Sequence, residues 1–140
     1  MITKPELYTF LHARELCVVS TVAESGNPEA AVVNFTVTPA LELIFYTLQT
    51  NRKCINLRRH PRLAAVIGWQ DEQTAQYEGV AEEVFELRLA ECRKAYLERF
   101  PNSAGRVAWP GVTFFRVRPA WVRYSSYCHP WKVEELTFPI

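Results

Sequence analysis

The chain has 140 residues, of which 49% are hydrophobic and 22% are charged, and its formal net charge is +1. These values are typical of one soluble domain over residues 1–140, and they exclude a strongly basic nucleic-acid-binding surface. No apolar run approaches the roughly 20 residues that a membrane helix needs, and residues 1–6 lack the apolar segment of a signal peptide. We therefore expect a cytoplasmic protein with no nucleic-acid or membrane partner.

The first part of the sequence predicts a short helix followed by three strands. Thr3 and Glu6 have the spacing of a capping box, and Leu7, Phe10 and Leu11 share one helical face. Turn-forming residues separate the apolar, β-branched runs that follow, which indicates a β-meander. The predicted ranges are 4–14 for the helix and 16–23, 29–38 and 42–48 for the strands.

The second part predicts three more strands and two helices. Pro61 ends the first of these helices, and near Glu86 the apolar spacing changes from a period of 2 to one of 3.6 residues. Sequential antiparallel strands without βαβ alternation favour an α+β fold, a closed or nearly closed β-barrel with short helices at its rim. The predicted ranges are 52–60 and 86–100 for the helices, 62–69, 74–84 and 112–127 for the strands, 101–111 for a loop and 128–140 for a tail.

The most informative segment connects the strand over 42–48 to the helix that begins at Arg52. Thr50 and Asn51 are good N-cap residues, and the free backbone N–H groups of a helix start favour an anion. Arg52 and Lys53 carry the wrong charge for a positive helix end unless an anion lies between them. The segment 50–53 therefore predicts a phosphate site, and the alternative is a solvated basic turn with an ordinary cap.

This segment resembles the pyridoxamine 5′-phosphate oxidase family. The chain reads F-Y-T at 45–47, N-R-K at 51–53 and H-P-R-L at 60–63, where the family typically reads F-Y-T, S-R-K and N-P-R-V. The resemblance implies a split β-barrel that binds FMN. It implies that Asn51, Arg52 and Lys53 hold the FMN phosphate and that Tyr46 and Thr47 lie beside it.

The resemblance extends over almost the whole chain. Residues 73–81 look like the family strand whose glutamine contacts the flavin ring, which implies Gln76 as a cofactor contact. Residues 131–136 look like the family's C-terminal segment, which implies a contact from Trp131. The family also implies a homodimer in which both chains contact FMN.

Two departures from the oxidase pattern concern the substrate. Residues 29–35 lack the R-x-x-x-x-K of true pyridoxamine 5′-phosphate oxidases, and no R-x-H element follows Pro119. The resemblance thus implies an FMN-dependent oxidoreductase that acts on another small molecule or electron donor, with no catalytic residue assigned. The alternatives are a flavin carrier or sensor, or a related barrel that uses haem or a deazaflavin.

The histidines and cysteines predict no metal site. His12, His60 and His129 are far apart, and the four cysteines form no C-x-x-C pair, so we expect reduced thiols that are mostly in the core. Cys54 follows the Arg-Lys pair, where a helix N-terminus could lower its pKa, but simple packing is the favoured interpretation.

Overall fold

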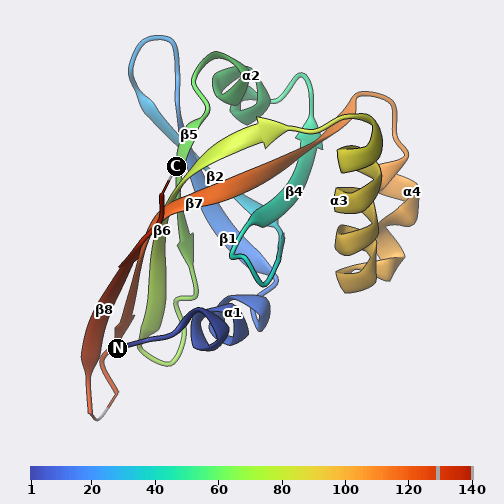
Figure 1. The fold of residues 1–140 in the computed structure, drawn as a ribbon. Coiled ribbons are helices and arrows are strands. Elements are labelled where there is room, and N and C mark those ends of the chain that lie inside the picture. The colour runs from blue at the N-terminus through green and yellow to red at the C-terminus, as the bar shows by residue number, and fades with distance from the viewer. Residues whose placement is uncertain (129, 140) are drawn as a thin grey trace.

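Eight strands form one antiparallel sheet that curls into a split, half-open barrel (Figure 1). The computed structural model describes residues 1–128 and 130–139. The strands are β1 (Leu16–Val22), β2 (Pro28–Asn34), β3 (Thr36–Val37), β4 (Leu43–Leu48), β5 (Arg62–Ile67), β6 (Gln73–Glu83), β7 (Val112–Ser126) and β8 (Lys132–Thr137). Their order in the sheet is β2-β1-β5-β6-β7-β4-β3, and β8 pairs with β7. The α+β split barrel expected from the sequence is thus confirmed.

Short helices cover the ends and one side of the barrel. Thr3 caps the first helix through the expected capping box with Glu6, and Pro61 follows His60, the C-cap residue of the second. Figure 1 shows the first helix at one end of the barrel, the second at the other, and the remaining helices together at one side, where the longest of them contacts β3 and β4. The helices are α1 (Lys4–His12), α2 (Arg52–Arg59), α3 (Glu86–Arg99), a 3₁₀ turn η1 (Pro101–Ser103) and α4 (Ala104–Val107). Among the described residues, no helix has the length and apolarity that crossing a membrane requires.

Strand β7 joins the two parts of the sheet. Its first half pairs with β4 on one edge and its second half pairs with β8, while β6 pairs along most of the other edge. The register between β6 and β7 shifts at Glu78 and Gly79, opposite Pro119. A side chain at Gly79 would meet the Arg118 carbonyl oxygen at 2.6 Å, so this bulge requires glycine.

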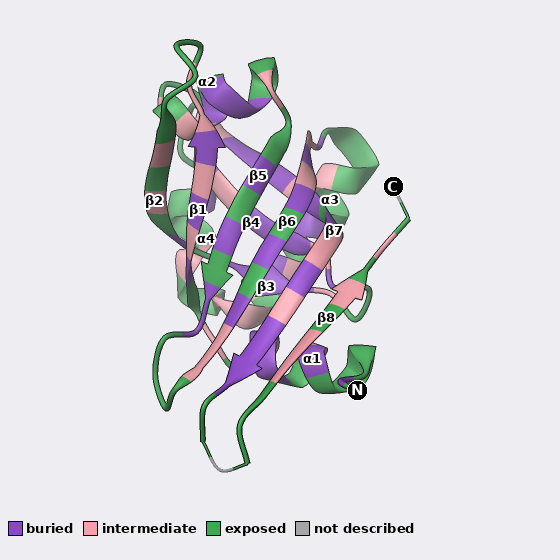
Figure 2. Cartoon of the chain, turned by 90° about the vertical axis from the view of Figure 1, so that its left-hand side faces the viewer, coloured by how far each residue is buried: buried purple, intermediate pink, exposed green. Residues whose placement is uncertain are grey.

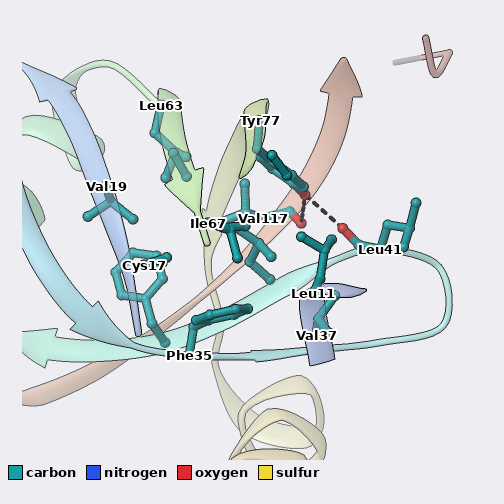
Figure 3. Close-up of a cluster of buried hydrophobic side chains, with 14 of the residues drawn as sticks. Leu11, Cys17, Val19, Phe35, Val37, Leu41, Leu63, Ile67, Tyr77 and Val117 are labelled. Carbon is teal, nitrogen blue, oxygen red and sulfur yellow. Dashed lines mark hydrogen bonds between the residues drawn. The ribbon is translucent and has the colours of Figure 1, made fainter. Parts of the chain in front are cut away.

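Alternate residues of the strands face the barrel interior, as the buried and exposed positions along β5 and β6 in Figure 2 show. The interior is filled by large apolar side chains, among them Phe35 and Phe45. The Tyr77 hydroxyl lies within this core and donates to the carbonyls of Leu41 at 2.8 Å and Val117 at 3.2 Å (Figure 3). Its polar group is therefore satisfied although the side chain is buried.

Four sequence predictions need correction. The strand expected over 29–38 is split at Phe35, because the N–H of Phe35 donates to Glu15 while β3 turns to pair with β4. The loop expected over 101–111 contains η1 and α4, which bury Val107. The tail over 128–140 contains β8, because the second half of β7 offers an unpaired edge. The first helix ends at His12, two residues earlier than expected.

Candidate functional site

The start of α2 leaves backbone donors open. Asn51 is the N-cap residue, but its side chain turns back along the chain, and its Nδ2 donates to Thr47 Oγ1 at 3.1 Å. The N–H groups of Cys54 and Ile55 both donate to the Asn51 carbonyl, at 3.1 and 3.2 Å. The N–H groups of residues 52 and 53 meet no acceptor within the described part of the chain. Two donors at a positive helix end are therefore free for an anion.

Arg52, the first residue of α2, is held by a carboxylate of the chain itself. Its Nη1 forms an ion pair with Glu29 Oε2 of β2. The other oxygen of Glu29 accepts a hydrogen bond of 2.8 Å from Asn56 Nδ2, which also donates to Thr21 Oγ1 at 3.0 Å. These hydrogen bonds, from Asn56 first and Arg52 second, lower the pKa of Glu29. Glu29 is consequently an anion at neutral pH.

Lys53 lies between two cavities that meet at the start of α2. Both cavities are lined by Asn51 and Lys53; one measures about 240 Å³ and the other about 390 Å³. The larger one also contains Glu29 and Arg52 in its wall. Lys53 is half-buried, and burial lowers its pKa. It forms no hydrogen bond or ion pair with another described residue, so its ammonium group is free to bind an anion.

Aromatic side chains form the wall of the smaller cavity. Tyr46 of β4 lies edge-on against Tyr96 of α3, with ring centroids 5.2 Å apart, and Trp109 stands exposed at the same cavity. Burial raises the pKa of Tyr96 to about 12, so its hydroxyl stays protonated. Arg106 of α4 adds a second cation to this wall. Flat apolar surfaces beside free cations suit a planar ligand that carries an anionic group.

Sequence reasoning missed Tyr96 and Arg106 as candidate site residues. Tyr96 belongs to the apolar stripe of its helix and packs on Phe114 and Phe100, so its residue type alone does not mark it as a site residue. Arg106 fell in a stretch predicted as loop. The tertiary fold brings both residues to the cavity, because α3 and α4 share a buried apolar cluster with β4, and no local sequence signal reports that packing.

The predicted cofactor residues divide into two groups. The chain brings together Tyr46, Thr47, Asn51, Arg52 and Lys53, all of which line one or both cavities at α2. The other predicted residues lie elsewhere.

Thr50 is exposed in the turn before α2 and lines neither cavity. Gln76 lies on the outer face of β6, opposite to the inward-pointing Tyr77, in a groove of about 290 Å³. Trp131 precedes β8, is 64% exposed and stacks on Tyr127, with ring centroids 5.9 Å apart. The β7–β8 hairpin lies at the other end of the barrel from α2 (Figure 1). Within one chain, Gln76 and Trp131 therefore do not join the α2 site.

The cysteine and histidine predictions have separate outcomes. Cys54 is fully buried, and burial raises its pKa, so packing is its role and thiolate chemistry at the helix start is not supported. Within residues 1–128 and 130–139, no group of three or more histidine, cysteine or acidic side chains could hold a metal ion. His129 lies outside the described residues.

The curled antiparallel sheet has the architecture of the split barrels, and a helix start that is open to an anion lies at one end of it. Residues 3–126 match the pyridoxamine 5′-phosphate oxidase family model, and the chain belongs to this family. A search of curated proteins gives no match.

Solved structures with the same fold have low sequence identity to this chain. A heme-binding protein from Mycobacterium smegmatis has a TM-score of 0.82 and 18% identity, with 98% of this chain and 59% of that protein covered. General Stress Protein 26 from Bacillus anthracis has a TM-score of 0.75 and 20% identity, over 96% and 98% of the two chains. The heme storage protein HutZ from Vibrio cholerae has a TM-score of 0.74 and 17% identity, over 98% and 95%. The chain thus spans less than two thirds of the M. smegmatis protein, and these similarities establish the fold.

Proposed function

We propose that this chain is a cytoplasmic FMN-binding protein and acts as an FMN-dependent oxidoreductase on a small molecule. The observation that carries the proposal is the open start of α2. Two free N–H groups lie there beside the half-buried, unpaired ammonium of Lys53. A phosphate would satisfy all three donors, whereas a solvated turn would leave a half-buried cation without a partner.

The aromatic wall supports a flavin in particular. Tyr46, Tyr96 and Trp109 lie at the cavity that shares Asn51 and Lys53 with the larger cavity. A ligand with its phosphate at the helix start can therefore place an aromatic ring against these side chains. The bound flavin would supply hydride transfer, and the chain would bind and orient it.

We further propose that the protein is a homodimer. Gln76 and Trp131, which the family resemblance assigns to the cofactor, lie away from α2 in their own chain. They can contact an FMN held at α2 only from a second copy. The outer face of the sheet around Gln76 also exposes Val66, and apolar surface of this kind is commonly covered by a partner.

The second candidate is haem binding, which is favoured by the heme proteins among the similar structures. The described residues that line the two α2 cavities include tyrosines and no histidine. The absorption spectrum of the purified protein separates the two candidates, because a flavin and a haem absorb at different wavelengths. A deazaflavin would also be recognised by its absorption spectrum, which differs from those of a flavin and a haem.

The test of the proposal is a titration of the purified protein with FMN and, in parallel, with riboflavin. We expect FMN to bind more tightly, because only FMN brings a phosphate to Lys53. Sedimentation should give a dimer of the 16.2 kDa chain. Stopped-flow mixing of the FMN form with NADH, NADPH and pyridoxamine 5′-phosphate should show reduction by a nicotinamide and little by pyridoxamine 5′-phosphate. A protein that binds no FMN would refute the proposal, and binding without reduction would favour a carrier or sensor.

A further inference from the structure

The cation at the first position of α2 already has an anionic partner. Arg52 is paired with Glu29, and its side chain is 82% exposed, whereas the Glu29 side chain is only 24% exposed. The pair lies in the wall of the larger cavity, next to Lys53. Glu29 is therefore the more buried partner, and the exposed side chain of Arg52 extends to it.

The position of Glu29 is fixed by buried neighbours. Asn56 of α2 and Thr21 of β1 are 5% and 2% exposed. Asn56 Nδ2 donates to Thr21 at 3.0 Å and to Glu29 at 2.8 Å. A buried polar group keeps such hydrogen bonds, because their loss would leave it unsatisfied. The carboxylate thus belongs to a built network that connects β1, β2 and α2.

The charge of Glu29 opposes the anion that the helix start attracts. Hydrogen bonds from Asn56 and Arg52 hold its pKa below the usual value, so the carboxylate stays ionised at neutral pH. Its charge cancels that of Arg52 and leaves Lys53 as the net cation of the larger cavity. A phosphate that enters must share Arg52 with Glu29, which already holds Nη1, and it also meets the repulsion of the carboxylate.

We infer that Glu29 is a specificity-determining residue that weakens the preference of this site for phosphorylated ligands. Glu29 competes with the ligand phosphate for Arg52. The ratio of FMN affinity to riboflavin affinity is therefore smaller than it would be if Arg52 and Lys53 were both free. The inference rests on the proposed FMN site and adds the residue that sets its selectivity.

The experiment compares FMN and riboflavin binding in wild type, Glu29→Gln, Arg52→Ala and the double variant. Glutamine keeps an oxygen that accepts from Asn56, so the network survives while the charge is removed. Glu91→Gln is the matched control, because Glu91 is exposed on α3 and the substitution changes the net charge equally. A thermal melt of each variant verifies folding.

We expect Glu29→Gln to bind FMN about tenfold more tightly, with riboflavin affinity changed less than about twofold. The gain should shrink to about threefold or less when Arg52 is already alanine, because the competition for its guanidinium has then disappeared. The control should leave the ratio of the two affinities unchanged. A merely structural role for Glu29 would change both ligands together.

The outcomes separate this inference from the proposed function. If FMN binds and Glu29→Gln leaves the FMN-to-riboflavin ratio unchanged or lowers it, the inference is wrong while the proposed function stands. The same holds if the gain persists in full without Arg52. If neither wild type nor any variant binds FMN, the proposed function fails and the inference fails with it.

Discussion

Lys53 should contribute more to FMN binding than Arg52. The Lys53 ammonium is half-buried, lies at both cavities and has no anionic partner among the described residues. Arg52 is 82% exposed and already paired with Glu29. Exchange of Lys53 for methionine keeps most of the aliphatic stem and removes only the charge, which makes Lys53→Met the informative substitution.

The expected magnitudes follow from these environments. A hydrogen bond to a charged group contributes about 1.5–3 kcal/mol, so Lys53→Met should weaken FMN binding about 10- to 150-fold. An exposed ion pair is worth little, and the guanidinium charge is already shared with Glu29 when a ligand arrives. Arg52→Ala should therefore weaken binding at most about fivefold. Riboflavin, which has no phosphate, should lose little affinity in either variant.

The assay is a calorimetric or fluorescence titration at fixed ionic strength, with Arg59→Ala as a control. Arg59 lies at the other end of α2 and donates to the Val22 carbonyl, so its loss should leave FMN binding nearly unchanged. Because burial lowers the pKa of Lys53, FMN affinity should fall as pH rises through that lowered value, and Lys53→Met should not show this fall. A larger loss in Arg52→Ala than in Lys53→Met would refute the reasoning.

Three further predictions concern stability and reactivity. The bidentate hydrogen bonds from Arg58 lower the pKa of Glu83, so Glu83→Gln should cost about 1 kcal/mol of unfolding free energy at pH 7. That difference should vanish in urea melts as pH falls below the usual carboxyl range, because protonation removes the same charge in the wild type. A thiol reagent should modify Cys128 rapidly and the three buried cysteines slowly, and Cys128→Ser should abolish the fast phase. Gly79→Ala should destabilise the fold by more than about 2 kcal/mol in the same urea melts, because its methyl group would meet the Arg118 carbonyl; a change under about 0.5 kcal/mol would contradict the bulge geometry.

The features that sequence reasoning predicted well are local ones. The capping box at Thr3, the helix that starts at Arg52 and the proline that follows it all depend on residues within one or two turns of each other. The alternation of β5 and β6 likewise reports directly which residues face the core. Local rules also identified Arg52 and Lys53 as cations at a helix start.

The features that sequence reasoning missed depend on residues far apart in the sequence. Local rules rank Arg52 above Lys53 as a phosphate ligand, because its guanidinium can donate two hydrogen bonds. The pairing of Arg52 with Glu29 leads us to predict the opposite order, and no spacing rule reveals a contact between β2 and α2. The same limit applies to Arg106, which reaches the cavity only because α4 joins the buried cluster that includes Ile44 of β4.

The pairing of β7 with β4, β6 and β8 has a consequence for biosynthesis. Leu43 in β4 pairs with Val117 in β7, and the edge of β6 pairs with residues 115–126 of the same strand. Contacts between such distant segments form slowly, because the intervening chain must first be brought together. During synthesis on the ribosome, the barrel interior therefore cannot close, and the apolar faces of β4, β5 and β6 stay uncovered, until β7 has emerged. During that interval apolar surface and unpaired strand edges are exposed, and these are the features that make partly folded chains prone to aggregate.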